Sequence, residues 1–112
     1  MTDATHTDRH LRLPDAPSEP GITSRTLHAD DTTKVVHFAF SAGEELSEHT
    51  SSRPAIIHIL TGSMDLSVAG EDIDGLPGTW VHMEAGTVHA LRARTPSTMI
   101  LTLLPRAAAG AS

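Results

Sequence analysis

Short apolar segments separated by turn residues are the feature that most constrains the fold of this chain. From about Ile22 onward the apolar residues recur in brief runs bounded by Gly, Pro, Asp and Ser, and nowhere do they keep a helical period over several turns. This pattern indicates an all-β protein, a sandwich or barrel of short strands. We expect strands near residues 23–28, 34–40, 46–50, 55–61, 63–69, 72–75, 79–83, 88–94 and 98–104.

The sequence predicts a single domain with a tail at each end. A chain of 112 residues has the size of one domain, so one functional site is expected. Residues 1–21 are polar and contain closely spaced prolines, which predicts an N-terminal arm that is flexible or draped over the domain. The domain itself is expected at 22–105 and a C-terminal tail at 106–112.

Composition excludes several classes of function. With 8 Lys and Arg against 14 Asp and Glu, the formal charge of −6 argues against nucleic acid or an anionic membrane as a partner. The absence of cysteine excludes disulfides, thiolate nucleophiles and Cys-containing metal sites. No apolar run is long enough to span a membrane and no secretory signal is visible, so we expect a cytoplasmic protein. Motifs typical of serine hydrolases, phosphate loops and dinucleotide-binding domains are not found.

Strand alternation predicts which side chains point into the domain. In 35–40 it places Phe38 and Phe40 on the inner face and His37 on the outer face. Residues 55–60 are apolar on both faces, so the outer face, with His58, needs a cover such as a second subunit or the arm. We therefore expect a homodimer that forms through the outer face of 55–60.

Two segments resemble, in order and spacing, the two sequence motifs of the cupin superfamily. They are GEELSEHTSSRPAIIHILTG at 43–62 and GTWVHMEAGTVHALRA at 78–93, and the resemblance covers roughly residues 25–104. Motif positions are matched by Gly43, His49, Gly62, Gly78, Gly86 and His89. The resemblance implies a small single-domain cupin, a β-barrel of the double-stranded β-helix or jelly-roll type.

The departures from the cupin pattern concern the metal ligands. Members of that family typically hold one metal ion with three histidines and a glutamate, and here Ser51 and Ala55 stand in place of one histidine and the glutamate. Only His49 and His89 remain. Catalytic metal sites generally need about three protein ligands. The resemblance thus implies at most a weak or unusual site for a divalent transition metal such as Mn, Fe, Ni or Zn.

Candidates for a third ligand can be named, each with a plainer alternative. His82 could face His89 across the bend that separates them, or it could be a hydrogen-bonded imidazole within the barrel. Glu45 has the parity of His49 if that stretch is extended, or it belongs to a solvated acidic loop. Met64 is expected to face inward, where a methionine is more typical of a core than of a metal site.

Three classes of function follow from these residues. In the first, the barrel interior binds a small organic molecule without turnover, fixed by His49, Ser51 and His89. In the second, the protein is a cupin enzyme of the oxygenase or isomerase type, with a metal held by His49, His89 and a recruited third ligand. In the third, His49 and His89 act as a metal-free acid and base. The expected pocket is lined by His49, Ser51, Ile57, Ile59, Met64, Leu66, Trp80, His82, His89 and Leu91.

Overall fold

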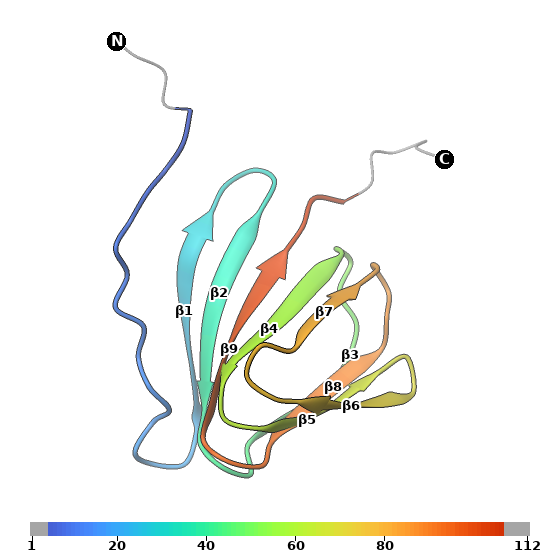
Figure 1. Ribbon diagram of the computed structural model, residues 1–112. Coiled ribbons are helices and arrows are strands. Elements are labelled where there is room, and N and C mark those ends of the chain that lie inside the picture. The colour runs from blue at the N-terminus through green and yellow to red at the C-terminus, as the bar shows by residue number, and fades with distance from the viewer. Residues whose placement is uncertain (1–4, 107–112) are drawn as a thin grey trace.

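The described chain folds into two antiparallel β-sheets that face one another (Figure 1). A computed structural model describes residues 5–106. Its strands are β1 (Ile22–Ala29), β2 (Lys34–Phe40), β3 (Glu45–His49), β4 (Ala55–Thr61), β5 (Met64–Val68), β6 (Glu71–Gly75), β7 (Trp80–Met83), β8 (His89–Ala93) and β9 (Ser97–Leu103). Each corresponds to a strand expected from the sequence, and the expectation of an all-β jelly roll is confirmed.

The two sheets divide the strands unequally. Sheet A has the order β1-β2-β9-β4-β7, and sheet B has the order β3-β8-β5-β6. Every pairing is antiparallel, and the strand order requires the chain to cross between the sheets repeatedly, as Figure 1 shows. Between residues 5 and 106 there is no helix long and apolar enough to cross a membrane.

A single apolar core lies between the sheets. Its largest fully buried side chains come from both layers, since Phe40, Ile57, Ile59 and Met99 belong to sheet A and Met64 and Leu66 to sheet B. Leu91, Met83, Ala55 and Ala93 complete the cluster. Alternation explains this arrangement, because every second residue of each strand points to the same face.

The β5–β6 hairpin shows how the turns fit the strands they join. Its two-residue loop, Ala69-Gly70, has positive φ at both positions, 52° and 80°. A loop of this kind matches the right-handed twist of the paired strands. Ala69 is the only residue other than glycine with positive φ in the described part of the chain.

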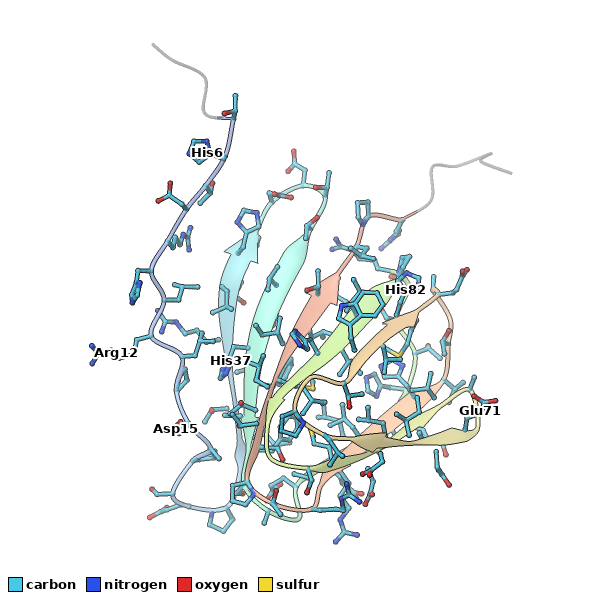
Figure 2. The ribbon with its side chains drawn as sticks, in the orientation of Figure 1. His6, Arg12, Asp15, His37, Glu71 and His82 are labelled. Atoms are coloured by element: carbon cyan, nitrogen blue, oxygen red, sulfur yellow. The ribbon has the colours of Figure 1, made fainter. Side chains whose placement is uncertain are left out.

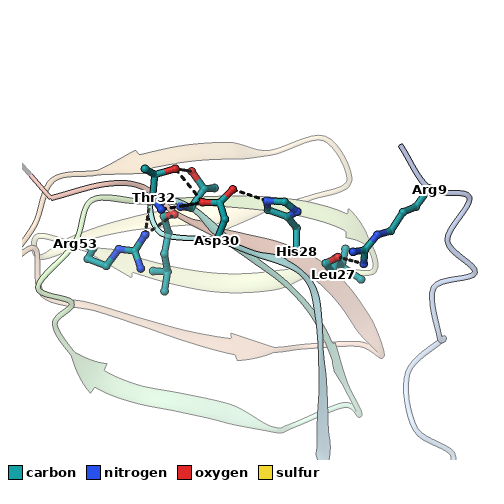
Figure 3. A network of polar contacts seen from close by, with 8 residues as sticks. Arg9, Leu27, His28, Asp30, Thr32 and Arg53 are labelled. Atoms are coloured by element: carbon teal, nitrogen blue, oxygen red, sulfur yellow. Dashed lines mark hydrogen bonds and ion pairs between the residues drawn. The ribbon is translucent and has the colours of Figure 1, made fainter. Parts of the chain in front are cut away.

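Arg53 joins the β3–β4 loop to the β1–β2 loop and to the end of β9, and Figure 3 shows it beside Thr32. Its guanidinium donates to the carbonyl oxygens of Thr32, Leu103 and Leu104 at 2.6, 3.3 and 2.8 Å. The β1–β2 loop is itself held by Asp30, whose carboxylate accepts hydrogen bonds from the backbone N–H groups of Thr32 and Thr33, both at 2.8 Å. The His28 side chain, and then these N–H groups, hold the pKa of Asp30 well below its usual range.

The arm runs beside β1, at the edge of sheet A (Figure 1). Arg9 donates to the carbonyl oxygen of Leu27 at 2.9 Å, and Arg25 on β1 donates to that of Arg12 at 3.2 Å. Residues 1–4 lie outside the described residues, and of the tail expected at 106–112 only Arg106 lies within them.

His37 points outward but is not exposed. The register places it between Arg25 and Ile100 on the outer face of sheet A, the face expected from alternation. Only 1 % of its surface is accessible, and Figure 2 shows it on the side of β2 toward the arm. Burial, and then the nearby charge of Arg25, lower the pKa of His37. Strand alternation predicts that His37 points outward, but it does not predict that this side chain is buried.

The turn at Gly62 provides a sharp test of packing. A Cβ at this position would lie 2.3 Å from the carbonyl oxygen of Pro96 and 2.3 Å from Ser97 Oγ. Gly43 has a similar φ, 86° against 83°, but nothing lies within 4 Å of a Cβ there. We expect Gly43→Ala to lower the free energy of unfolding by roughly 1–2 kcal/mol, from φ alone. Gly62→Ala should lower the free energy of unfolding by at least about 2 kcal/mol more than Gly43→Ala, because its Cβ also clashes with Pro96 and Ser97. Urea unfolding measures both losses. Equal losses would contradict the clash.

The buried His37 predicts a pH dependence of stability. Because its folded pKa is lowered, the unfolded chain binds the proton more readily, so stability is full above the ordinary value of 6.5 and declines as pH falls below it. We expect His37→Leu to flatten the fall in the free energy of unfolding between about pH 7.5 and 5. His10→Leu, in the exposed part of the arm, is the control and should keep the wild-type slope. An unchanged slope in His37→Leu would contradict the assignment.

Candidate functional site

A β-bulge in β3 places His49 on the inner face of sheet B. Leu46 pairs with Leu91 and His49 pairs with His89, so the segment between them contains one residue more on β3 than on β8. In a regular strand, Leu46 and His49 would point to opposite faces, because they are three residues apart. The bulge therefore turns His49 toward the same side as Leu46 and His89. Bulges next to functional sites commonly reorient a side chain in this way.

The same bulge corrects the expectation for Glu45. The sequence gives Glu45 and His49 the same parity if the stretch is a regular strand, but the register pairs Glu45 with Arg92 on the outer face. Glu45 and His49 thus lie on opposite faces of sheet B. Glu45 cannot serve as a third ligand beside the histidines, because one inserted residue reverses the alternation between them.

His49 and His89 form a cross-strand pair. Their ring centroids are 4.1 Å apart, with an angle of 60° between the ring planes. His89 is 7 % exposed, whereas His49 lies on the edge strand β3 and is exposed. The pair therefore has one ring anchored inside the barrel and one open to solvent.

Each ring is fixed by a hydrogen bond within its own chain segment. His49 Nδ1 lies 2.7 Å from the carbonyl oxygen of Ser47, and His89 Nδ1 lies 2.9 Å from that of Thr87. A carbonyl oxygen can only accept, so each neutral ring must carry its proton on Nδ1. The lone pair of each ring is then on Nε2, at the opposite edge. This tautomer is the one that a metal or a hydrogen-bond donor would require.

The loops around the pair are joined by backbone hydrogen bonds. Gly86 donates to the carbonyl oxygen of Ser51 at 2.8 Å, which links the end of the first motif to the turn before β8. Ser51 Oγ accepts from the backbone N–H of Arg53 at 3.1 Å. Ser51, expected to help fix a ligand, is therefore placed in a loop where its hydroxyl already has a partner.

Glu71, which sequence reasoning did not single out, lies in the same row of sheet B as the pair, two strands beyond His89. The register continues the row His49, His89, Val68 and Glu71 across β3, β8, β5 and β6. Glu71 is exposed, and Figure 2 shows it at the far end of β6. Only the pairing of four strands reveals this row, because the two histidines and Glu71 belong to segments with no common motif.

Trp80 and His82 do not reach the interior, which corrects two of the expected site residues. Trp80 pairs with His58 and His82 with Ile56, which puts both on the outer face of sheet A. Trp80 is 58 % exposed, its ring centroid lies 6.4 Å from that of His82, and Figure 2 shows His82 projecting from β7. β7 belongs to sheet A and β8 to sheet B, so the intervening bend leads from one layer to the other instead of bringing His82 to His89.

The expected apolar lining faces inward but is engaged in packing. Ile57, Ile59, Met64, Leu66 and Leu91 are all at most 3 % exposed and belong to the core cluster. Within residues 5–106, no group of three or more His, Cys, Asp or Glu side chains is arranged to hold a metal ion. The geometry thus brings two imidazoles together without a third ligand of those types.

Comparison with known proteins identifies the family. The model of the cupin domain family matches residues 36–104, well over half of the 112-residue chain. No curated protein matches the chain.

Solved structures agree in fold. A conserved protein of unknown function from Streptococcus pyogenes is 25% identical, with a TM-score of 0.76 over 90% of this chain and 93% of that one. An RmlC-like cupin from Desulfovibrio desulfuricans is 24% identical, with a TM-score of 0.77 over 91% and 100%. KdgF from a Halomonas species is 23% identical, with a TM-score of 0.74 over 88% and 91%. On the match of its motifs, its family model and its two-sheet fold, the chain belongs to the cupin domain family.

Proposed function

We propose that this small cupin binds a small organic molecule at the His49–His89 pair, without a tightly held metal. The observation that supports this most directly is the pair of Nδ1 hydrogen bonds to Ser47 and Thr87, which leave both Nε2 lone pairs available. Two such acceptors suit a molecule that offers two hydrogen-bond donors, or one acidic proton, to neighbouring rings. His49 is exposed, so a molecule can approach from solvent.

Accessibility of the inner ring also supports binding. Among residues 5–106, the only buried side-chain nitrogen or oxygen without a partner is His37 Nδ1. His89 Nε2 makes no hydrogen bond there either, so it must touch solvent despite the low exposure of its residue. A ligand that reaches this atom gains a fixed acceptor next to the apolar core.

The chain's own residues fit a resident metal poorly. The cupin pattern would supply a third histidine and a glutamate at Ser51 and Ala55, but Ala55 is 3 % exposed in the core and Ser51 Oγ is bound to Arg53 N–H. Two imidazoles alone bind a divalent ion weakly compared with a three-ligand site. Tight binding would need donors from outside this set, so no step of the proposed function passes through a metal.

The tautomer assignment can be tested directly. We expect long-range ¹H–¹⁵N correlation spectra of histidine-labelled protein at about pH 8 to show the proton on Nδ1 in both His49 and His89. His49→Ala and His89→Ala spectra assign the signals. A proton on Nε2 of either ring would contradict the hydrogen bonds on which the proposal depends.

Ligand binding can be tested by thermal shift with small organic acids and polyols as probes. A molecule present at about 100 times its Kd adds roughly 2.7 kcal/mol of stability, or about 10 °C in Tm for a domain of this size. We expect the shift to vanish in His49→Ala and His89→Ala and to persist in the control His10→Ala. Shifts that survive both site variants would place binding elsewhere.

A metal-dependent enzyme of the oxygenase or isomerase type is the second candidate, favoured by the same free Nε2 atoms. It requires metal bound in stoichiometric amounts to protein purified without chelator or affinity tag. Mn, Fe, Ni and Zn should then raise Tm in the wild type and not in His89→Ala. If the purified protein contains no metal and none of these metals raises Tm, the metal-dependent enzyme is excluded in favour of metal-free binding at His49 and His89.

A further inference from the structure

Three side chains on the outer face of sheet A are buried although they point away from the core. His37, Ala39 and Thr98 are 1 %, 0 % and 5 % exposed, and Ala39 pairs with Thr98 in the register of β2 and β9. Phe38 and Phe40 alternate with them on β2 and face the core. The core therefore cannot bury these three residues, which we call the outer patch, and another segment of the chain must cover them.

The arm is attached to the sheet at both ends of the outer patch. At one end, the backbone N–H of Gly21 donates to Ser41 Oγ at 2.8 Å, and the backbone N–H of Ser41 donates to the carbonyl oxygen of Gly21 at 3.1 Å. At the other end, Arg25, the partner of His37 on β1, donates to the carbonyl oxygen of Arg12 at 3.2 Å. The arm is therefore tied to sheet A beside the outer patch at two points.

Between these two attachments the arm buries apolar side chains, and nearer its start it does not. Leu13, Ala16 and Pro17 are half-buried, whereas residues 5–10 are exposed. A hollow of about 610 Å³ separates residues 5–11 from the neighbouring parts of β1 and β2. This pattern indicates that the arm rests on the sheet along the outer patch and stands away from it nearer its start.

No carboxylate is placed to balance a positive charge on His37. Its cross-strand neighbours are Arg25 on β1 and Ile100 on β9, and the adjacent outward residues of β2 and β9 are uncharged. Within residues 5–106 His37 forms no ion pair, and its Nδ1 has no hydrogen-bond partner. Figure 2 shows Arg12 projecting away from the sheet. The charged groups of the arm along this stretch are all exposed: Arg12, Asp15 and Glu19.

From these observations we propose that the arm is a pH-dependent strap, which is closed over neutral His37 and is released when that imidazole is protonated. In the closed form an imidazolium would lack its water, would keep an unpaired donor and would lie beside the like charge of Arg25. The arm is the part that can yield, because a few hydrogen bonds hold it, whereas β2 is paired along its whole length with β1 and β9. Release returns water to the ring without opening either sheet.

Acid is the direction that opens the strap. Burial, and then the charge of Arg25, lower the pKa of His37 in the closed form, so the open form binds the proton more readily. Below the ordinary value of 6.5, the ratio of open to closed arm should rise about tenfold for each pH unit, until His37 of the closed form itself becomes protonated. Acid therefore uncovers the outer patch and the edge of β1.

The order of the arm is tested by ¹⁵N relaxation on the full-length protein. At pH 7.5 we expect backbone order parameters for residues 11–16 close to those of the strands, about 0.85, and at pH 5 values below about 0.6. The order parameters of β2 and β9 should not change. The strap is overturned by an arm that is already mobile at pH 7.5, by an arm that stays ordered at pH 5, or by loss of order in β2 together with the arm.

The role of His37 is tested with His37→Leu, which removes the titrating group and keeps a side chain that tolerates burial. We expect residues 11–16 of this variant to keep their closed order parameters at both pH values. His10→Leu, in the exposed part of the arm, is the control and should release the arm at pH 5 as the wild type does. If His37→Leu also releases the arm at pH 5, another group controls it.

A titration of the wild type tests the same link without any substitution in the patch. Spectra of histidine-labelled protein follow the protonation of His37, and ¹⁵N relaxation follows the arm over the same pH series. We expect both to change at the same pH, below 6.5, because protonation and release are one linked event. Protonation of His37 under an arm that stays ordered, or release of the arm while His37 is neutral, would contradict the proposal.

Discussion

The packing of two sheets across one apolar layer is the constraint on which the rest of this molecule depends. Phe40, Ile59, Met64 and Met99 are almost completely buried in that layer, and little of the interior is left for chemistry. In sheet B the polar side chains on the inner face therefore lie at the ends of the strands. His49 and His89 lie at such an end, at the last position of β3 and the first of β8. The candidate site is thus a consequence of how the core is filled.

The strands and the direction of most of their side chains could be predicted from the sequence, because turn residues and alternation are local signals. The strands, the inward direction of Met64 and the outward direction of His58 all follow from period-two patterning and from the positions of glycine and proline. The prediction was wrong where a non-local feature intervened. The bulge in β3 reverses Glu45 relative to His49, and the crossing between layers separates His82 from His89. The burial of His37 depends on its surroundings in the folded protein, which no strand pattern contains.

Five of the histidines fall into two groups that lie on different sheets. His49 and His89 share an inner row of sheet B, whereas His37, His58 and His82 share the outer side of sheet A. The first group has its protons fixed by carbonyl oxygens, so that both rings are held as acceptors. The second group faces away from the core, and its members differ in exposure, since His37 is buried whereas His82 is exposed.

Arg53 links the loops at one end of the barrel in a way that is less sensitive to acid and salt than an ion pair would be. All three of its acceptors are backbone carbonyl oxygens, which keep no titratable proton, and a guanidinium stays charged throughout the range in which proteins are folded. Acid cannot release this link by protonating a partner, and added salt screens a charge–dipole contact at short range only weakly. The β3–β4 loop, which follows His49, is therefore tied to the β1–β2 loop and to the end of β9 by a link that neither acid nor salt removes. The frame on this side of the candidate site does not depend on an ion pair.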